Sequence, residues 1–121
     1  MKLNSAFLSC SALIALTSSA AAFQASTTRA SVSTGGLQGN NLSFEAWISA
    51  DGRFVAFQSS ATNFVAGDTN AAPDVFVRDL RNGTTERVSV ATGGAQGNSG
   101  AVAPSISADG RFVAFAGYSS N

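Results

Sequence analysis

Three side chains with oxygen donors lie in the segment GDTNAAPD, between two apolar stretches of the chain. Counted from Asp68, the residues Asp68, Asn70 and Asp74 occupy positions 1, 3 and 7, and calcium loops place ligands in such an alternation. A loop of the EF-hand type also has a central glycine and a final glutamate, where this chain has Pro73 and Asp79. The pattern leaves two interpretations: a Ca²⁺ site, or loop capping in which Asp and Asn side chains bond to nearby backbone.

Catalysis by the usual side-chain pairs finds little support. Asp51 and Asp109 stand in equivalent contexts, and paired carboxylates can serve acid–base chemistry, but each belongs to an Asp-Gly pair that predicts a turn. The sequence contains no His, and its one cysteine is Cys10, so no imidazole can activate a nucleophile. We therefore predict no catalytic residue and a protein that is not an enzyme.

Glycine and charge patterns exclude two further kinds of ligand. TGGLQGN and TGGAQGN have neither the glycine spacing of a dinucleotide site nor the lysine of a phosphate loop. Basic and acidic residues balance at 7 each, which provides no basic surface for nucleic acid. We predict turns at both glycine-rich segments, no nucleic-acid partner, and no cofactor other than the Ca²⁺ considered above.

The elements that position these residues follow from an internal repeat with a step of 58 residues. ISADGRFVAF occurs at 48–57 and again at 106–115, and RASVSTGGLQGN at 29–40 aligns with RVSVATGGAQGN at 87–98. From residue 29 to residue 63, 20 of 35 positions are identical in the second copy. Repeats of this kind build solenoids, propellers or other arrays.

Each copy predicts antiparallel strands joined by tight turns. Dipeptides that favour type I′ hairpins separate the apolar runs, and they are Asp51-Gly52, Asn82-Gly83 and Asp109-Gly110. The expected strands are 47–49, 53–58, 74–80 and 85–90. The second of these is apolar throughout its middle, which indicates cover on both faces. Because four-stranded sheets covered on both faces pack radially in a propeller, the predicted fold is all-β, with β-propeller blades of four antiparallel strands.

Two segments resemble the WD-like repeats of the TolB-type β-propeller family: PSISADGRFVAF at 104–115 and DVFVRDLRNGTTERVSV at 74–90. Family repeats run from a Ser-Pro-Asp-Gly turn through an apolar strand ending in Phe to a strand ending near Asp. This chain has Ala50 and Ala108 in place of the turn proline, and Ala46 where the second copy keeps Pro104. The resemblance covers essentially all of residues 23–121 and implies blades of this class, although the departures distinguish the chain from the TolB protein itself.

The chain divides into a leader and a repeat region. Residues 1–22 combine Lys2, an apolar run and small residues up to Ala22, which is the layout of a secretory signal peptide. Cleavage after Ala22 would export the remainder to the periplasm or the exterior, without a membrane anchor. The partial propeller at 23–121 is expected to contain an orphan outer strand at 27–33, a complete blade at about 46–90 and the start of the next blade at 104–121.

The incomplete ring predicts how the chain behaves alone. The orphan strand would complete a blade whose other strands this sequence does not contain, and open sheet edges promote association. We therefore expect the chain to be the leading part of a longer propeller, and to associate with itself when isolated.

The expected binding surface lies at the end of the sheets that carries the long loops. Long loops in a compact fold commonly carry function. The residues expected to bind ligand there are Trp47, Asn63, Asp68 and Asn70. We predict a non-catalytic binding or scaffold module for a protein or glycan partner. Two alternatives stay open: an accessory propeller of a secreted hydrolase, and a Ca²⁺-stabilised extracellular repeat.

Overall fold

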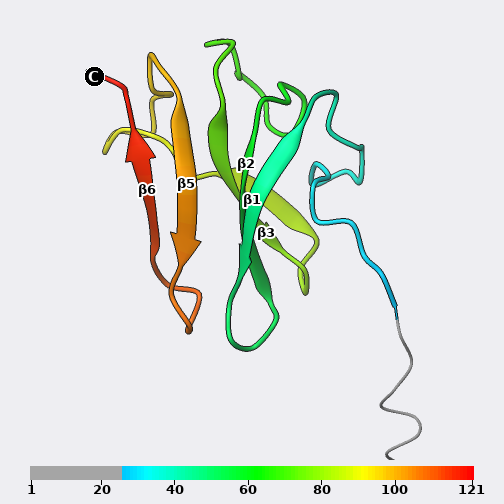
Figure 1. Cartoon of the computed structure of the whole chain (residues 1–121). Coiled ribbons are helices and arrows are strands. Elements are labelled where there is room, and N and C mark those ends of the chain that lie inside the picture. Colours follow the sequence, from blue (N-terminus) through cyan, green and yellow to red (C-terminus); the bar gives the residue numbers. More distant parts are fainter. Residues whose placement is uncertain (1–25) are drawn as a thin grey trace, which may run out of the picture.

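The computed structural model describes residues 26–121, which form two antiparallel sheets (Figure 1). The first sheet has the order β1-β2-β3-β4, and the second pairs β5 with β6. The strands are β1 (Ser43–Ile48), β2 (Phe54–Ser59), β3 (Asp74–Asp79), β4 (Thr84–Arg87), β5 (Ala101–Ile106) and β6 (Val113–Gly117). The described residues form no helix, and so none that could cross a membrane. The all-β prediction is thus confirmed, while the proposed leader at 1–22, with Cys10, lies outside the described residues.

The first sheet is buried on both faces at its centre, as the apolar run in its second strand predicts. Val55 and Phe57 of β2 face one side of the sheet, and Ala56 faces the other. All three are buried, with exposures of 8%, 2% and 0%. The sheet therefore carries a second layer on each side, and the two layers come from different parts of the chain.

An aromatic cluster fills the first of these faces. Phe57 and Phe76 are cross-strand partners whose rings stack 5.8 Å apart. Phe64, from the loop between β2 and β3, meets both rings edge-on at 5.6 Å and 5.1 Å, a favoured geometry for aromatic pairs. Ala30, from the segment before β1, packs against this cluster. The loop and the N-terminal segment together close the core on this side.

The second sheet covers the opposite face of the first. The Ala103 backbone N–H of β5 donates to Gln58 Oε1 of β2 at 3.3 Å, and the Ala50 N–H donates to the Ala108 carbonyl at 2.9 Å. A Cβ atom at Gly110 would overlap the Phe54 ring, so this glycine lies directly on β2. The two β-hairpin turns of the repeat are therefore in contact, side by side at the lower end of Figure 1.

The hairpins form where expected, but the type I′ assignment was wrong. Only the glycine of each dipeptide has positive φ: 73° at Gly52, 71° at Gly83 and 72° at Gly110. The Gly52 N–H donates to the Ser49 carbonyl at 2.9 Å, which closes a type I turn followed by a left-handed glycine. These turns are longer than the two-residue type I′ turn, and carboxylates cap them. The Asp51 carboxylate, for example, accepts the Arg53 N–H at 3.0 Å.

The orphan strand expected at 27–33 is absent from the structure. This segment forms one isolated bridge, between Val32 and Gln38, and the carbonyls of Val32 and Ser33 accept side-chain hydrogen bonds from β4 and β3. Arg78 Nη1 donates to the Ser33 carbonyl at 3.1 Å, and the Thr85 N–H donates to Thr34 Oγ1 at 3.0 Å. The segment has no neighbouring strand to pair with among the described residues, so side-chain bonds replace a backbone ladder.

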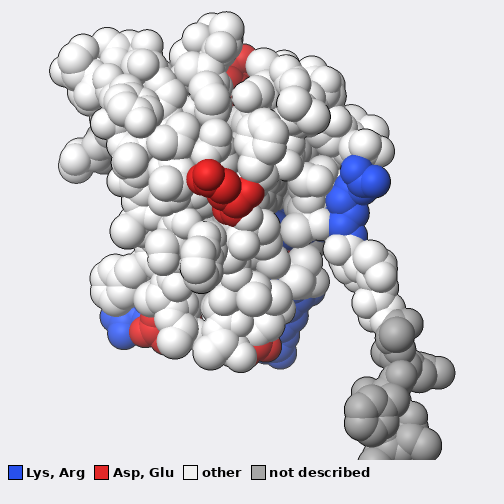
Figure 2. Space-filling view, in the orientation of Figure 1, with Lys and Arg blue, Asp and Glu red and all other residues white. Residues whose placement is uncertain are grey.

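The other expected strands lie within a few residues of the observed ones. β1 begins at Ser43 rather than at 47, because a bulge between Phe44 and Trp47 separates two short runs of pairing with β2. Tight turns lie at one end of the sheets and long loops at the other, as predicted (Figure 1). The surface in the same orientation is mostly uncharged, with acidic atoms near its centre and both acidic and basic atoms at its margins (Figure 2).

Truncation of Phe57 tests whether the aromatic core is closed. Phe57→Ala is expected to lower the free energy of unfolding by about 3–5 kcal/mol. Phe115 occupies the same repeat position but is 38% exposed, so Phe115→Ala should cost about 1 kcal/mol or less. Urea unfolding followed by circular dichroism measures both. Equal losses would contradict the closed aromatic core, and Phe57→Leu provides a smaller step if alanine prevents folding.

The contact between the two hairpin turns predicts unequal effects of one substitution at two equivalent glycines. Gly52 and Gly110 share their positive φ, but a Cβ at Gly52 meets nothing within 4 Å. Gly52→Ala should therefore cost only the backbone strain, about 1–2 kcal/mol. Gly110→Ala should cost at least about 1 kcal/mol more, since its methyl group must displace Phe54. Equal unfolding midpoints in urea would mean that the two sheets do not pack in this way.

Candidate functional site

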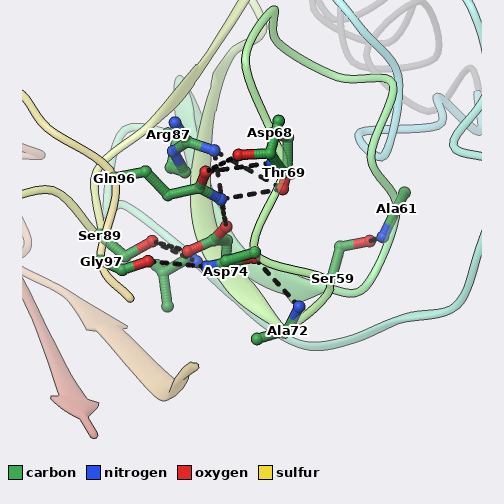
Figure 3. A network of polar contacts seen from close by, with 12 residues as sticks. Ser59, Ala61, Asp68, Thr69, Ala72, Asp74, Arg87, Ser89, Gln96 and Gly97 are labelled. Atoms are coloured by element: carbon green, nitrogen blue, oxygen red, sulfur yellow. Dashed lines mark hydrogen bonds and ion pairs between the residues drawn. The ribbon is translucent and has the colours of Figure 1, made fainter. Parts of the chain in front are cut away.

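A buried polar network joins the start of β3 to the connection between β4 and β5 (Figure 3). Asp74, only 1% exposed, accepts hydrogen bonds from Ser89 Oγ at 2.7 Å and from Gln96 Nε2 at 3.1 Å. The same Gln96 nitrogen donates to Asp68 Oδ1 at 3.0 Å. Ser89 Oγ accepts the Val75 N–H at 3.1 Å. Two side chains of the β4–β5 connection, Ser89 and Gln96, thus donate hydrogen bonds to the two carboxylates.

Arg87 supplies the positive charge of this network. Its Nη1 lies 3.7 Å from Asp68 Oδ1 and 3.6 Å from Asp74 Oδ2. Nη1 and Nε have no hydrogen-bond partner among the described residues, so the attraction is mainly electrostatic. Burial raises the pKa of Asp68, the nearby charge of Asp74 raises it further, and Gln96 and Arg87 oppose the rise. A desolvated carboxylate in this position favours its protonated form.

The arrangement favours loop capping over a Ca²⁺ site. Asn70 is occupied locally, because its Oδ1 accepts the Ala72 N–H and its Nδ2 donates to the Gly97 carbonyl, both at 3.0 Å. Asp68 and Asp74 face N–H donors and a guanidinium, whereas Ca²⁺ needs about six or more oxygen ligands. Within residues 26–121, no group of three or more His, Cys, Asp or Glu side chains could hold a metal ion.

Asn63, a predicted ligand residue, joins two loops through side-chain hydrogen bonds. Its Oδ1 accepts the Asn40 N–H at 3.0 Å, and its Nδ2 donates to the Gln38 carbonyl at 2.9 Å. The second copy repeats both bonds: Asn121 accepts from Asn98 at 3.0 Å and donates to the Gln96 carbonyl at 3.1 Å. The recurrence identifies a structural element of the repeat.

The carboxylates of the hairpin turns also serve the fold. Asp51 accepts the Ser49 hydroxyl at 2.6 Å, and Asp109 accepts the Ser107 hydroxyl at the same distance. These hydrogen bonds lower the pKa of both carboxyl groups. Asp79, at the third turn, accepts three hydrogen bonds from the Arg53 guanidinium, and this pairing is the main cause of its lowered pKa. The remaining turn residue, Asn82, donates from Nδ2 to Asp79 at 2.9 Å.

Trp47 is the predicted ligand residue that stays open to solvent, with 59% exposure. It lines a groove of about 610 Å³ between β1 and β5, together with Glu45, Ala46, Ala103, Pro104 and Ser105. The structure does not bring Trp47 together with Asn63, Asp68 or Asn70 at one site. Those three residues belong to the loops at the other end of β1, and their polar groups bond within the protein.

The sequence analysis does not predict Arg87, Ser89 and Gln96 as partners of the segment 67–74, called the acidic loop below because it contains Asp68 and Asp74. A signal was present, since all three recur 58 residues earlier as Arg29, Ser31 and Gln38. Comparison with protein-family models, with curated proteins and with solved structures found no match to this chain. The interpretation of the site therefore depends on its own geometry.

The raised pKa of Asp68 predicts the sign of a pH dependence. The folded state holds the Asp68 proton to higher pH than the unfolded state, so Asp68 contributes less to stability as pH rises above about 4. Asp68→Asn removes this dependence while it keeps an oxygen acceptor for Gln96. Relative to the unmodified protein, the variant should gain stability as pH rises above about 4.

Asp51→Asn is the matched control, because the pKa of Asp51 is lowered in the folded state. Its stabilisation is present above about pH 4 and is lost as pH falls further. The difference between protein and variant should therefore have the opposite sign of pH dependence. Urea unfolding at a series of pH values measures both, and parallel profiles for the two variants would contradict the assignment.

Proposed function

We propose that this chain is part of an exported β-propeller of the TolB-like or WD-like class, which serves as a non-catalytic scaffold for binding a protein or a glycan. The observation that carries the proposal is the recurrence of the same hydrogen bonds at a step of 58 residues. Each repeat would be one blade. Export follows from the leader-like composition of residues 1–22.

The packing on both faces of the first sheet supports a radial array. One face contacts the N-terminal segment through Ala30, and the other contacts β5. A sheet that is buried on both sides by neighbouring repeats is the situation of a propeller blade. A two-sheet sandwich would leave one face of each sheet to solvent, whereas here Ala56 and Phe57 are both buried.

The N-terminal copy of the network residues supports a further neighbour. Arg87, Ser89 and Gln96 bind the carboxylates of the acidic loop, but their counterparts Arg29 and Gln38 are exposed. In a ring, these residues would meet the acidic loop of a last blade. The segment 27–33 would then become the outer strand that the sequence predicts.

Large apolar side chains exposed on the loops and on β1 support the binding role. Leu37 and Leu42, in the segment before β1, are 67% and 65% exposed, and Trp47 is 59% exposed. Exposed large apolar and aromatic side chains are enriched at protein-binding surfaces. The chain contains no His, which supports a role without acid–base activation of a nucleophile.

An extended chain tests the repeat architecture directly. A copy of residues 64–121 is appended after Asn121, which continues the 58-residue step. The added segment supplies a second acidic loop and new partners for β6. We expect slower hydrogen exchange at Val113–Gly117 and a melting temperature that is several degrees higher, because each repeat stabilises its neighbour.

A matched control carries Ala in the appended copy at the position equivalent to Asp74. It should show a smaller gain, since the new carboxylate network cannot form. Two results would contradict the proposal: unchanged exchange in β6, or an appended segment that melts independently of the first.

A further inference from the structure

The groove between β1 and β5 combines a carboxylate with an exposed aromatic ring. Glu45 and Trp47 line one wall, and Ala103, Pro104 and Ser105 line the other. Both side chains belong to the bulged part of β1, where Glu45 adopts a φ of 51°. A non-glycine residue with positive φ is uncommon, so the fold holds this segment in a specific conformation.

Glu45 has no counter-charge in the described part of the chain. The ion pairs of residues 26–121 join Arg53 to Asp79, and Arg87 to Asp68 and Asp74. Among the residues that line the groove, Glu45 is the only charged one. It is also the only acidic residue of β1 and β5. The groove therefore presents one negative charge with apolar walls on both sides.

We propose that this groove binds a basic side chain, arginine or lysine, of a partner protein. The Trp47 ring attracts a cation over its face, and tryptophan is the best of the aromatic residues for this contact. The Glu45 carboxylate supplies the opposite charge, and a guanidinium can bond to it in bidentate fashion. A neutral sugar could stack on the ring, but it would leave the carboxylate without its complement.

The second copy of the repeat shows that the backbone does not require these two side chains. Ala103 occupies the position of Glu45 with almost the same φ, 54°, and the same bulge interrupts the pairing of β5 with β6. Ser105 stands at the position of Trp47. The bulge thus forms without a charge or an aromatic ring. Folding does not require Glu45 and Trp47 at these positions, and recognition of a partner accounts for their presence.

This inference deepens the proposed function, because it names the class of partner at the scaffold, but its test is separate from that of the repeat architecture. Trp47 is the only tryptophan of the sequence, so its fluorescence reports this groove alone. The full chain is titrated with the peptide acetyl-Gly-Arg-Gly-amide. The peptide should change Trp47 fluorescence with saturation, and 0.5 M NaCl should weaken the effect.

Two controls isolate the charge. The same peptide with citrulline in place of arginine has nearly the same shape but no charge, and it should bind at least about threefold more weakly. Glu45→Gln should weaken binding of the arginine peptide by a similar factor. Glu86→Gln, which alters an exposed acid of β4, should leave the affinity unchanged. Both variants should keep the circular dichroism spectrum of the unmodified protein.

Several results would overturn the inference. They are a titration with no saturating change, equal binding of the arginine and citrulline peptides, and an affinity that Glu45→Gln does not alter. A saturating response to a neutral disaccharide such as cellobiose, stronger than that to the arginine peptide, would assign the groove to a glycan instead. None of these results bears on the extended-chain experiment, so the scaffold proposal can stand or fall independently.

Discussion

The burial of one carboxylate constrains much of this structure. Asp74 opens β3 with 1% of its surface exposed, and a buried charge is tolerated only when it is paired and hydrogen-bonded. Its partners, Ser89 and Gln96, come from the connection that leads to the second sheet. Satisfying Asp74 therefore fixes the path of the chain between the two sheets, and with it the contact of β5 with β2. Arg87 keeps the local charge from becoming strongly negative.

Local sequence signals predict the hairpins well and their details less well. The apolar run of β2 and the Asp51-Gly52 turn before it are sufficient to place β2, because the hydrophobic pattern and the turn residues agree there. The turn type depends on side-chain capping by Asp51 and Asp79, which the dipeptide alone does not reveal. The segment 27–33 has the same composition as a strand, yet a strand exists only where a neighbour offers its backbone. The sequence pattern shows that the segment could form a strand, but it does not show whether a neighbouring strand is present to pair with it.

The sequence also does not reveal the hydrogen-bond partners of the predicted site residues. Asp68, Asn70 and Asn63 lie in a long loop, and because long loops commonly carry function, the sequence predicts them as ligand residues. Each of them has a partner in the fold, supplied by residues such as Gln96 and Asn40 that are more than 20 positions away in the sequence. Spacing within one loop cannot reveal such partners. The internal repeat can, since polar residues that recur at the 58-residue step are those whose bonds recur.

This comparison of copies also separates residues that maintain the fold from those free to serve binding. Positions 48–57 are identical in the second copy, and they form the capped turn and the buried strand. Positions 43–47 all differ, although the bulge in that strand is retained in both copies. A backbone that persists while its side chains change is determined elsewhere, by the flanking turn and by pairing with the next strand. The edge strand can then vary its exposed side chains at little cost in stability, and Glu45 and Trp47 occupy such positions.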